Sequence, residues 1–593
     1  MILTRLYSNI EEKFTPIKFN SGLNIVLGEI RIPENMQKDT HNLGKSTLAT
    51  LIDYCLLKEQ YKTFFLFKHF DIFKEFIFFL ELEYDKGQFL TIKRGVENNT
   101  KISFLKHTEN MQNFTHLSDD MWTHCHLSIG RAKQILDSIL NLEVVKPYDY
   151  RKPVSYALRS QDDYSDVFQL KKFVRHIQWK PYLAKVLGLN SELVQVQYEL
   201  KQKYEEAKIK TESLKKELVG FTDSLDKLEG LILIKEQEAD LIQTQLDEFN
   251  FEIEENNVNK ELVYSIDSQL SDLNKERYYL TSSIEKLESS LNKHKIIFNP
   301  NEAKAIFEEA GVLFEGQIKK TYDELIEFNK EITKERQTYL KEELKEAKKE
   351  FQNIEEQISR LNKDRSTALY FLKDAGVMKQ YKVLSNKMIK LDAEILTLKK
   401  QEEKLLEYDK AKSKKEKLKA KIDKNKISIL ENVKDSRSKD SVYSQIKLNF
   451  NAVVKSILDK EALISIDQNK EGNLEFKDEI LDDEGNETSE SDGKTYKKLL
   501  CIAFDIAVNQ VYIDDRYTHF VYHDGFLEKL DNRKKINFIE LIRKITKNNF
   551  QYIGTLIDSE LPNLDKSIFK EGEIILTLHD DGDNGRLFKI PIW

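Results

Sequence analysis

Cysteine, glycine and proline are scarce in this 593-residue chain, which contains 3, 20 and 8 of them. The cysteines, Cys55, Cys125 and Cys501, stand far apart and form no paired metal-ligand spacing. We therefore expect a reduced, cytoplasmic protein without a zinc site. Few glycines and prolines, together with 33% charged residues, are typical of long solvated helices rather than of loops.

Long hydrophobic runs are also missing. The sequence shows no apolar stretch near the ~18 residues that a membrane-spanning helix needs, and its first residues show no signal-peptide pattern, so we expect no membrane segment. A formal net charge of −8 argues against wholesale coating of nucleic acid, although local basic patches can still bind it. At 593 residues the chain is too long for one compact core, so several domains or a long extended element are expected.

A short motif at 42–47 predicts a phosphate-binding loop. It follows the apolar run 23–28 and precedes the apolar segment 48–52, and a strand, loop and helix in this order are the context that such a motif requires. Backbone N–H groups at the start of the helix would hold the phosphates. The Lys45 ammonium would reach the β- and γ-phosphates, and the Ser46 hydroxyl would bind Mg²⁺. The loop residues predicted to bind nucleotide are Asn42, Gly44, Lys45, Ser46 and Thr47.

The loop departs from the usual motif, because Asp39 stands six residues before the lysine, where a glycine is expected. The nearest glycine that could replace it is Gly28. Around this loop, residues 1–190 are predicted to be mixed α/β, with a β-hairpin formed by 76–84 and 88–94.

From residue 191 the pattern changes to heptads of apolar residues. Such a pattern buries a narrow stripe against a partner helix and imposes a left-handed supercoil. The first seam stops at Pro300, and the second is interrupted near Gly376. We predict an antiparallel hairpin with a first arm at 191–298, an apex at 299–320 and a second arm at 321–430. The seam residues include Leu214, Leu218, Phe221, Leu225, Leu228, Ile232, Ala239, Ile242, Leu246, Phe249, Ile253, Leu280, Leu344, Ile354, Ile358 and Leu391.

The second arm ends in a lysine-rich stretch. Such a run is usually the solvated face of a helix, but where the arm would return to the globular part it could also contact the DNA backbone. The candidate DNA-binding residues are Lys412, Lys414, Lys415, Lys417, Lys419 and Lys421.

Globular patterning returns over 431–593. Ser491 and Gly493 precede an apolar-periodic helix that includes 499–507. The apolar run 519–524 ends in Asp524, which is the form of a Walker B strand whose carboxylate holds Mg²⁺ through water. Asp531 follows seven residues later.

Taken together, these residues resemble an ABC-type ATPase head of the SMC/RecN kind. The fold implied is an α/β ABC-type ATPase head split in sequence by a long antiparallel α-helical coiled coil. By this resemblance Gln161 follows the first lobe, Ser491 and Gly493 form the signature, and Asp531 belongs to the Leu-Asp pair beyond Asp524. Taken by itself, Gln161 would be read as a surface-loop residue.

The same resemblance implies the roles of these residues. Lys45, Gln161 and Asp524 would be catalytic, and Ser46, Gln161 and Asp524 would bind Mg²⁺. The Ser491 and Gly493 of a second copy would cap the γ-phosphate, so that the protein would be a homodimer through ATP-bridged heads. ATP and Mg²⁺ are the implied cofactors.

A closer likeness is to the coiled-coil ABC ATPases of bacterial ABC three-component defence operons, which include the SMC-like subunit of Lamassu antiphage systems. It rests on 41–47, 158–164, 522–525 and 530–531. It implies a sensor of double-stranded DNA, at ends or unusual structures, that pairs with a small middle subunit and restrains an effector, often a nuclease.

Several positions depart from the family pattern. Gly525 stands where the catalytic glutamate is expected, and Leu556 stands where a switch histidine is expected. Glu528 is near in sequence, but we expect it to point elsewhere unless the loop is remodelled. His523 could act locally, although a histidine in a strand more often packs or forms a hydrogen bond. We therefore expect ATP binding with slow hydrolysis.

Two other functions remain open at this point. One is a RecN-like ATPase for DNA double-strand-break repair that turns over continuously, against which Gly525 argues. The other is a structural coiled-coil scaffold that uses nucleotide for dimerisation and binds no nucleic acid.

Overall fold

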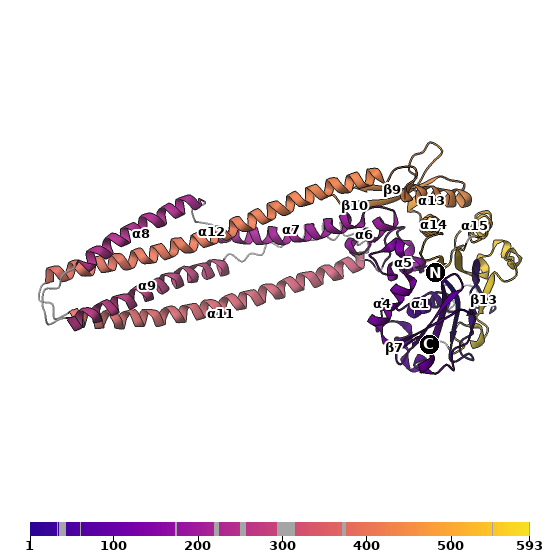
Figure 1. The fold of residues 1–593 in the computed structure, drawn as a ribbon, viewed down its shortest axis with the longest axis horizontal. Helices are drawn as coiled ribbons and strands as arrows, with labels where there is room; N and C mark the ends of the chain where they lie inside the picture. The colour runs from indigo at the N-terminus through magenta and orange to yellow at the C-terminus, as the bar shows by residue number, and fades with distance from the viewer. Residues whose placement is uncertain are drawn as a thin grey trace. The chain divides into compact units, whose positions relative to one another are not determined.

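The computed structural model describes residues 1–591 except 33, 35–42, 60, 172, 174, 219–223, 249–256, 293–314, 370–374 and 548. These residues form two compact units (Figure 1). The globular unit consists of Met1–Tyr204 and Leu418–Trp593, and the helical unit consists of Glu205–Lys417. The globular unit thus joins two segments that are far apart in sequence.

A parallel sheet of five strands lies at the centre of the globular unit, in the order β13-β3-β12-β11-β8. Neighbouring strands pair in parallel, and their runs are almost entirely buried in β3, β8, β11 and β12, as expected of a covered parallel sheet. The first segment supplies β3 (Leu23–Glu29) and β8 (Leu158–Arg159). The last segment supplies β11 (Phe520–His523), β12 (Gln551–Ile557) and β13 (Ile574–His579). Because β3 lies between two strands of the last segment and β8 pairs with a third, neither segment can complete this core without the other.

A second, antiparallel sheet is built from the first segment, in the order β2-β1-β4-β5-β6-β7. The predicted hairpin is confirmed as β4 and β5, which are joined through Lys86 and Gly87. Gly87 has φ 68°, which a tight turn of this kind favours. The strands are β1 (Ile2–Ser8), β2 (Ile17–Lys18), β4 (Ile77–Asp85), β5 (Gln88–Gly95), β6 (Lys101–His107) and β7 (His124–Ser128).

Helices and a short two-stranded sheet complete the globular unit. The sheet pairs β9 (Ala462–Gln468) with β10 (Leu474–Ile480) in antiparallel fashion. One hydrophobic core includes Leu27 and Leu158 of the first segment and Leu500 and Val521 of the last. The helices are α1 (Lys45–Cys55), α2 (Phe65–Lys68), α3 (Phe70–Phe73), α4 (Ile129–Leu140), α5 (Arg151–Ala157), α6 (His176–Val186), α13 (Val442–Leu458), α14 (Lys494–Val511) and α15 (Asn532–Ile545).

Long helices form the helical unit, and they pair in antiparallel fashion. They are α7 (Ser191–Glu217), α8 (Leu225–Asp247), α9 (Asn257–Asn292), α11 (Glu315–Leu369) and α12 (Ala375–Asp435), of which α7 and α12 extend into the residue range of the globular unit. Between α9 and α11, ion pairs join Glu288 to Lys348 and Arg277 to Glu355. Between α8 and α12, Lys235 pairs with Glu394. Residue numbers on one helix fall as those on its partner rise, which agrees with the hairpin that the heptads predict.

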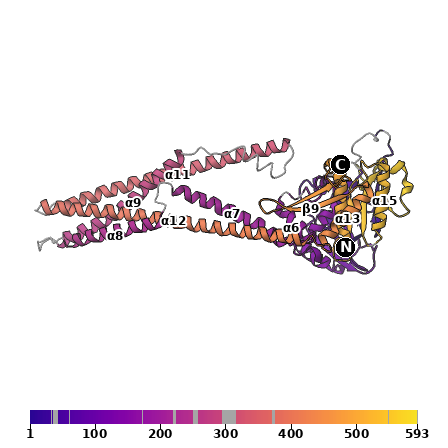
Figure 2. The same ribbon diagram turned by 90° about the horizontal axis from the view of Figure 1, so that it is seen from above.

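The helix α9 makes a second contact that the hairpin prediction does not include. Ser271 Oγ donates a hydrogen bond to Asp392 Oδ2 at 3.1 Å, and farther along both helices the Lys400 ammonium lies over the Tyr279 ring. Here the numbers rise together, so α9 runs parallel to α12 (Figures 1 and 2). Within the helical unit, α9 and α11 are therefore folded back alongside α12.

Most of the predicted seam is confirmed where side chains are described. Buried members include Leu228, Ile232, Ala239, Ile242, Leu246, Leu280, Ile354, Ile358 and Leu391. Phe221, Phe249 and Ile253 lie outside the described residues, as do 299–314 of the predicted apex. In the parts of the chain that the structure describes, we find no helix long and apolar enough to cross a membrane.

Candidate functional site

The predicted phosphate loop leads into α1, whose first residue is Lys45. Gly44 caps this helix with φ 98°, a left-handed conformation that favours glycine, and a Cβ added there would lie 2.6 Å from Leu587 Cβ. A Cβ on Gly28 would lie 3.3 Å from Lys45 Nζ. The two glycines therefore leave room for the turn and for the lysine side chain folded back over β3. Asn42 lies outside the described residues.

Asp524 follows β11 directly and is 1% exposed. Ser46 Oγ donates a hydrogen bond to its Oδ2 at 2.5 Å, although 478 residues separate them in sequence. Thr555 Oγ1 donates to Oδ1 at 2.5 Å from the neighbouring strand β12. The structure thus brings Ser46 and Asp524 together, and a hydroxyl with a carboxylate is the oxygen donor set that suits Mg²⁺. Thr47 lies half-buried on the first turn of α1.

Gln161 lies beside the end of β11, because β8 pairs with β11 and Gln161 opens the 3-10 turn η4 (Gln161–Tyr164) just after β8. A Cβ on Gly525 would lie 3.4 Å from Gln161 Nε2. The side chain is exposed. Gln161 therefore lies next to the residue that follows Asp524, as the family resemblance implies.

The sequence predicts that Glu528 points elsewhere unless the loop is remodelled, and the chain does reverse after Gly525. A tight turn brings it back, because Gly525 and Lys529 have φ 64° and 62° and the Glu528 N–H donates to the Gly525 carbonyl at 3.2 Å. Its Oε2 lies 3.4 Å from the position that a Cβ on Gly525 would take, and it accepts a hydrogen bond from Lys498 Nζ at 3.0 Å. A carboxylate therefore stands close to the place of the missing glutamate.

The charges of four carboxylates act on the Lys45 ammonium. Burial lowers the pKa of Lys45, while the charges of Glu560, Asp524, Asp558 and Glu528 act in the opposite direction. Burial likewise raises the pKa of Glu560, which accepts a hydrogen bond from the Ile557 N–H. Such a concentration of negative charge is suited to a site that holds a divalent cation.

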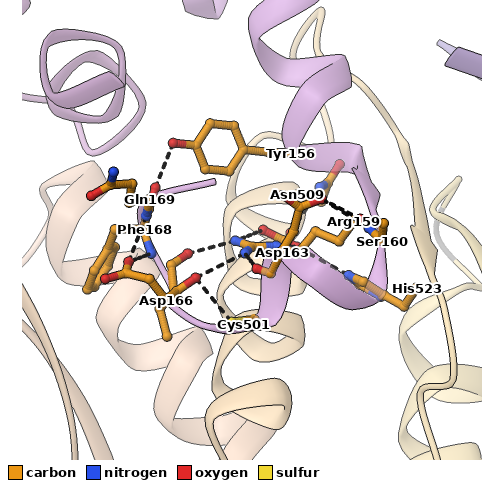
Figure 3. A network of polar contacts seen from close by, with 12 residues as sticks. Tyr156, Arg159, Ser160, Asp163, Asp166, Phe168, Gln169, Cys501, Asn509 and His523 are labelled. Atoms are coloured by element: carbon orange, nitrogen blue, oxygen red, sulfur yellow. Dashed lines mark hydrogen bonds and ion pairs between the residues drawn. The ribbon is translucent and has the colours of Figure 1, made fainter. Parts of the chain in front are cut away.

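A buried ion pair joins the segment that carries Gln161 to α14 (Figure 3). The guanidinium of Arg159 donates from Nε to Asp505 Oδ2 at 2.5 Å and from Nη2 to Asp505 Oδ1 at 3.1 Å. It also donates to the carbonyls of Asp163 and Val167. Burial opposes its charge, but Asp505 more than offsets this and the pKa of Arg159 is raised. The pair therefore fixes the chain on both sides of Gln161 against α14.

His523 belongs to the same buried network. Its Nε2 lies 3.2 Å from Asp505 Oδ2, and burial lowers its pKa. Of the two interpretations of this histidine, the contact supports the packing role in a strand.

The remaining predicted nucleotide ligands make local contacts. Ser491 is 3% exposed, and its Oγ donates to the Thr488 carbonyl at 3.2 Å. Gly493 is exposed and caps α14. Asp531 caps α15 by accepting a hydrogen bond from the Lys534 N–H at 3.0 Å. These contacts lie within one chain, so the contact of the signature residues with the nucleotide of a second copy stays a prediction.

The predicted DNA-binding lysines lie on α12. Lys415 is half-buried, and the others, Lys412, Lys414, Lys417, Lys419 and Lys421, are exposed. Leu418, between Lys417 and Lys419, and Ile422, directly after Lys421, are buried. The row is thus a solvated helix face, and its surface is open to a phosphate backbone.

Sequence reasoning missed four residues of this site, namely Lys498, Asp505, Thr555 and Glu560. Lys498, Asp505 and Thr555 each contact a partner from another element of the fold, whereas Glu560 caps its own short turn, η6 (Asp558–Glu560). Arg159 could have been found, because it is a charged residue directly after the apolar residues Ala157 and Leu158.

Comparisons with known proteins give limited matches. A family model described as an uncharacterised protein conserved in bacteria (DUF2326) matches residues 453–592. Among curated proteins there is no match. An Smc head domain with a coiled coil and joint from Pyrococcus yayanosii is similar at 13% identity, over 94% of this chain and 92% of that one, with a TM-score of 0.35.

A second solved structure is similar over a comparable span. It is an Smc head domain with an extended coiled coil, bound to the C-terminal domain of ScpA, from Pyrococcus furiosus. The identity is 10%, the match covers 95% of this chain and 91% of that one, and the TM-score is 0.30. TM-scores this low carry no conclusion about function.

Proposed function

We propose that the globular unit binds ATP and Mg²⁺ as an SMC-like ATPase head. The observation that carries this proposal is the meeting of Lys45, Ser46 and Asp524, because their sequence motifs predict this arrangement and the fold brings them together from opposite ends of the chain. The N-terminus of α1 and Lys45 would bind the phosphates. Ser46 and Asp524 would hold Mg²⁺, which neutralises charge on the transferred phosphoryl group.

The residues present fit these ligands. Gly28 and Gly44 leave space that a Cβ would fill, and the hydroxyl and carboxylate oxygens of Ser46 and Asp524 already point at each other. Gln161 lies near enough to Gly525 to orient a water molecule or a metal ligand.

We further propose that two globular units close on the same nucleotide through the signature. Gly493 is exposed while Ser491 is buried, so the exposed N-terminus of α14 is the part that would first meet the γ-phosphate of the other copy. The helix has 18 residues, long enough for its N-terminal dipole to favour an anion.

The experiment that tests this function is light scattering of the purified chain with and without ATP, beside a direct nucleotide-binding assay. We expect ATP to produce a dimer, Lys45→Ala to abolish nucleotide binding, and Gly493→Arg to keep nucleotide binding while remaining monomeric. Gly230→Arg on α8 is the matched control, because a Cβ there meets open space. A wild-type chain that is saturated with ATP and stays monomeric would contradict the bridged dimer.

For the cellular role we propose a sensor or clamp for double-stranded DNA, at ends or unusual structures. The exposed lysines of α12 support binding to the DNA backbone and to DNA shape rather than to base edges. The sensor would control an effector, of nuclease type, together with a small middle subunit in antiphage or antiplasmid defence.

One observation favours a second candidate function. The glycine at position 525 lacks the carboxylate expected there, which predicts slow hydrolysis. Glu528 lies beside Gly525, so another carboxylate is available at this place. This keeps a repair-type ATPase of the RecN kind as the alternative, and the rate of ATP turnover distinguishes the two.

A further inference from the structure

The space beside Gly525 is filled by side chains from two other parts of the globular unit and by Glu528 of its own turn. A Cβ placed on Gly525 would lie 3.1 Å from Lys498 Nζ, 3.4 Å from Gln161 Nε2 and 3.4 Å from Glu528 Oε2. Gly525 also has φ 64°, a conformation that side-chain-bearing residues rarely adopt. A glutamate at this position would thus be strained and crowded by Lys498, Gln161 and Glu528.

Lys498 holds the Glu528 carboxylate beside Gly525. Its Nζ lies 3.0 Å from Glu528 Oε2 and 4.9 Å from the centre of the Tyr164 ring. Lys498 is 9% exposed, whereas the Glu528 side chain is 37% exposed. A shielded cation thus presents a carboxylate that solvent can reach, which is what a water-activating group requires.

The base of this arrangement is rigid. Lys498 stands on α14, where Leu499, Leu500 and Cys501 are buried in the core of the globular unit. About two turns beyond Lys498, Asp505 of the same helix binds Arg159. Since Arg159 also fixes the segment of Gln161, the same contacts set the positions of Lys498 and Gln161 relative to the end of β11.

A second carboxylate near Lys45 is less well placed. Glu560 accepts a hydrogen bond from the Ile557 N–H at 3.0 Å, whereas the three atoms nearest to a Cβ on Gly525 belong to Lys498, Gln161 and Glu528. Glu560 is nevertheless the natural competitor in any test.

We propose that Glu528 is the catalytic carboxylate of this site and that Lys498 is the positioning residue that holds it. The inference rests on the proposed ATPase function. The oxygen of a water molecule forms a bond to the γ-phosphorus as the bond from phosphorus to the β,γ-bridging oxygen breaks, and that electron pair stays on ADP. The proton of the water passes to the Glu528 carboxylate, which later returns it to solvent.

The test measures nucleotide binding, phosphate release and the lifetime of the ATP-induced dimer on the full chain. For Glu528→Gln we expect unchanged ATP binding, a kcat lower by about 10²- to 10⁴-fold, the range for general-base catalysis, and a dimer that persists longer with ATP. Glu528→Asp, which keeps a shorter carboxylate, should retain an intermediate rate. Glu571→Gln, an exposed substitution in the same unit, should behave as wild type.

Lys498 is tested by rescue and by non-additivity. Lys498→Met should lower kcat with KM unchanged, and Lys498→Arg should restore much of it, because the cation that holds Glu528 is kept. In the double variant with Glu528→Gln, the loss should not exceed that of Glu528→Gln by itself. Lys547→Met is the matched exposed control.

Distinct results would overturn the inference and the proposed function. Wild-type turnover in Glu528→Gln, a loss confined to Glu560→Gln, or a wild-type chain that binds ATP without releasing phosphate would overturn the role of Glu528. A wild-type chain that does not bind ATP would overturn the proposed function itself, and the inference with it. Thermal unfolding of each variant shows whether a lost rate reflects lost folding.

Discussion

Arg159 and Asp505 place two opposite charges in the interior of the globular unit. Both side chains are at most 3% exposed, and two hydrogen bonds join them. Removing charges from water is costly. Loss of one partner of such a pair therefore destabilises the folded state, because the other charge stays buried without compensation. Here the pair connects the segment of Gln161 with α14, so its loss should also shift the position of Gln161 in the site.

Asp505→Asn should therefore destabilise the globular unit by about 3–5 kcal/mol, because Arg159 stays charged and buried. Chemical unfolding followed by tryptophan fluorescence measures this, since Trp179 lies in the same core. Glu471→Gln breaks the more exposed pair with Lys201 and should cost no more than about 1 kcal/mol. Equal effects of the two substitutions would show that the buried pair has no special role.

At this scale, sequence reasoning found the residues whose partners or roles lie in a local motif. Lys45 and Ser46 follow from the phosphate loop, and Asp524 follows from the end of an apolar run. Lys498 and Glu560 could not be found in this way, because their positions depend on how α14 and the segment after β12 pack around the sheet. The position of Glu528 depends on two residues with positive φ, Gly525 and Lys529, which reverse the chain in a way that the sequence pattern does not reveal.

At the scale of helices, the seam of the helical unit shows what a heptad pattern can and cannot predict. The pattern identified the buried stripe, including Leu228, Ile242 and Ile354, and the antiparallel pairing of the arms. It could not predict that α9 also packs against α12, because a stripe shows that a partner exists without identifying it. An ion pair of Asp267 with Arg365 and a hydrogen bond from the Tyr381 hydroxyl to Asp267 join α9, α11 and α12 at this contact.

The fold-back of α9 is tested by cross-linking. In a Cys125→Ser background, Ser271→Cys with Asp392→Cys should react with a short bis-maleimide within one chain, because these two side chains form a hydrogen bond. Cys55 and Cys501 are buried and should not interfere. The control pair is Ser271→Cys with Lys341→Cys. The antiparallel register of α9 and α11 places Lys341 about 20 residues, roughly 30 Å, beyond Ser271 along the helix. Products that link two chains, or none, would contradict the fold-back.

At the scale of the whole molecule, the proposed clamp depends on charge rather than on sequence readout. Reversing Lys415, Lys417 and Lys419 to Glu should weaken DNA binding and reduce its dependence on salt, because each phosphate contact contributes about 0.9 to the slope of log K against log salt. A titration of fluorescent duplex DNA at several salt concentrations measures both.

The control for this titration is Lys341, Lys345 and Lys349 to Glu on α11, which are exposed lysines on another long helix. It makes the same change of net charge and should leave DNA affinity near that of the wild type. Equal losses in both triple variants would mean that overall charge, and not the lysines of α12, determines binding.

We propose that this molecule is a slow ATPase whose rate of ATP hydrolysis changes when it binds DNA. The most direct measurement is ATP hydrolysis by the purified chain with no DNA, with closed circular DNA and with linear DNA, beside a Lys45→Ala control. We expect slow turnover that changes with linear DNA and disappears in Lys45→Ala. Brisk turnover on any DNA would contradict the sensor and favour the repair-type ATPase. Turnover that persists in Lys45→Ala would show that ATP is not hydrolysed at the proposed site.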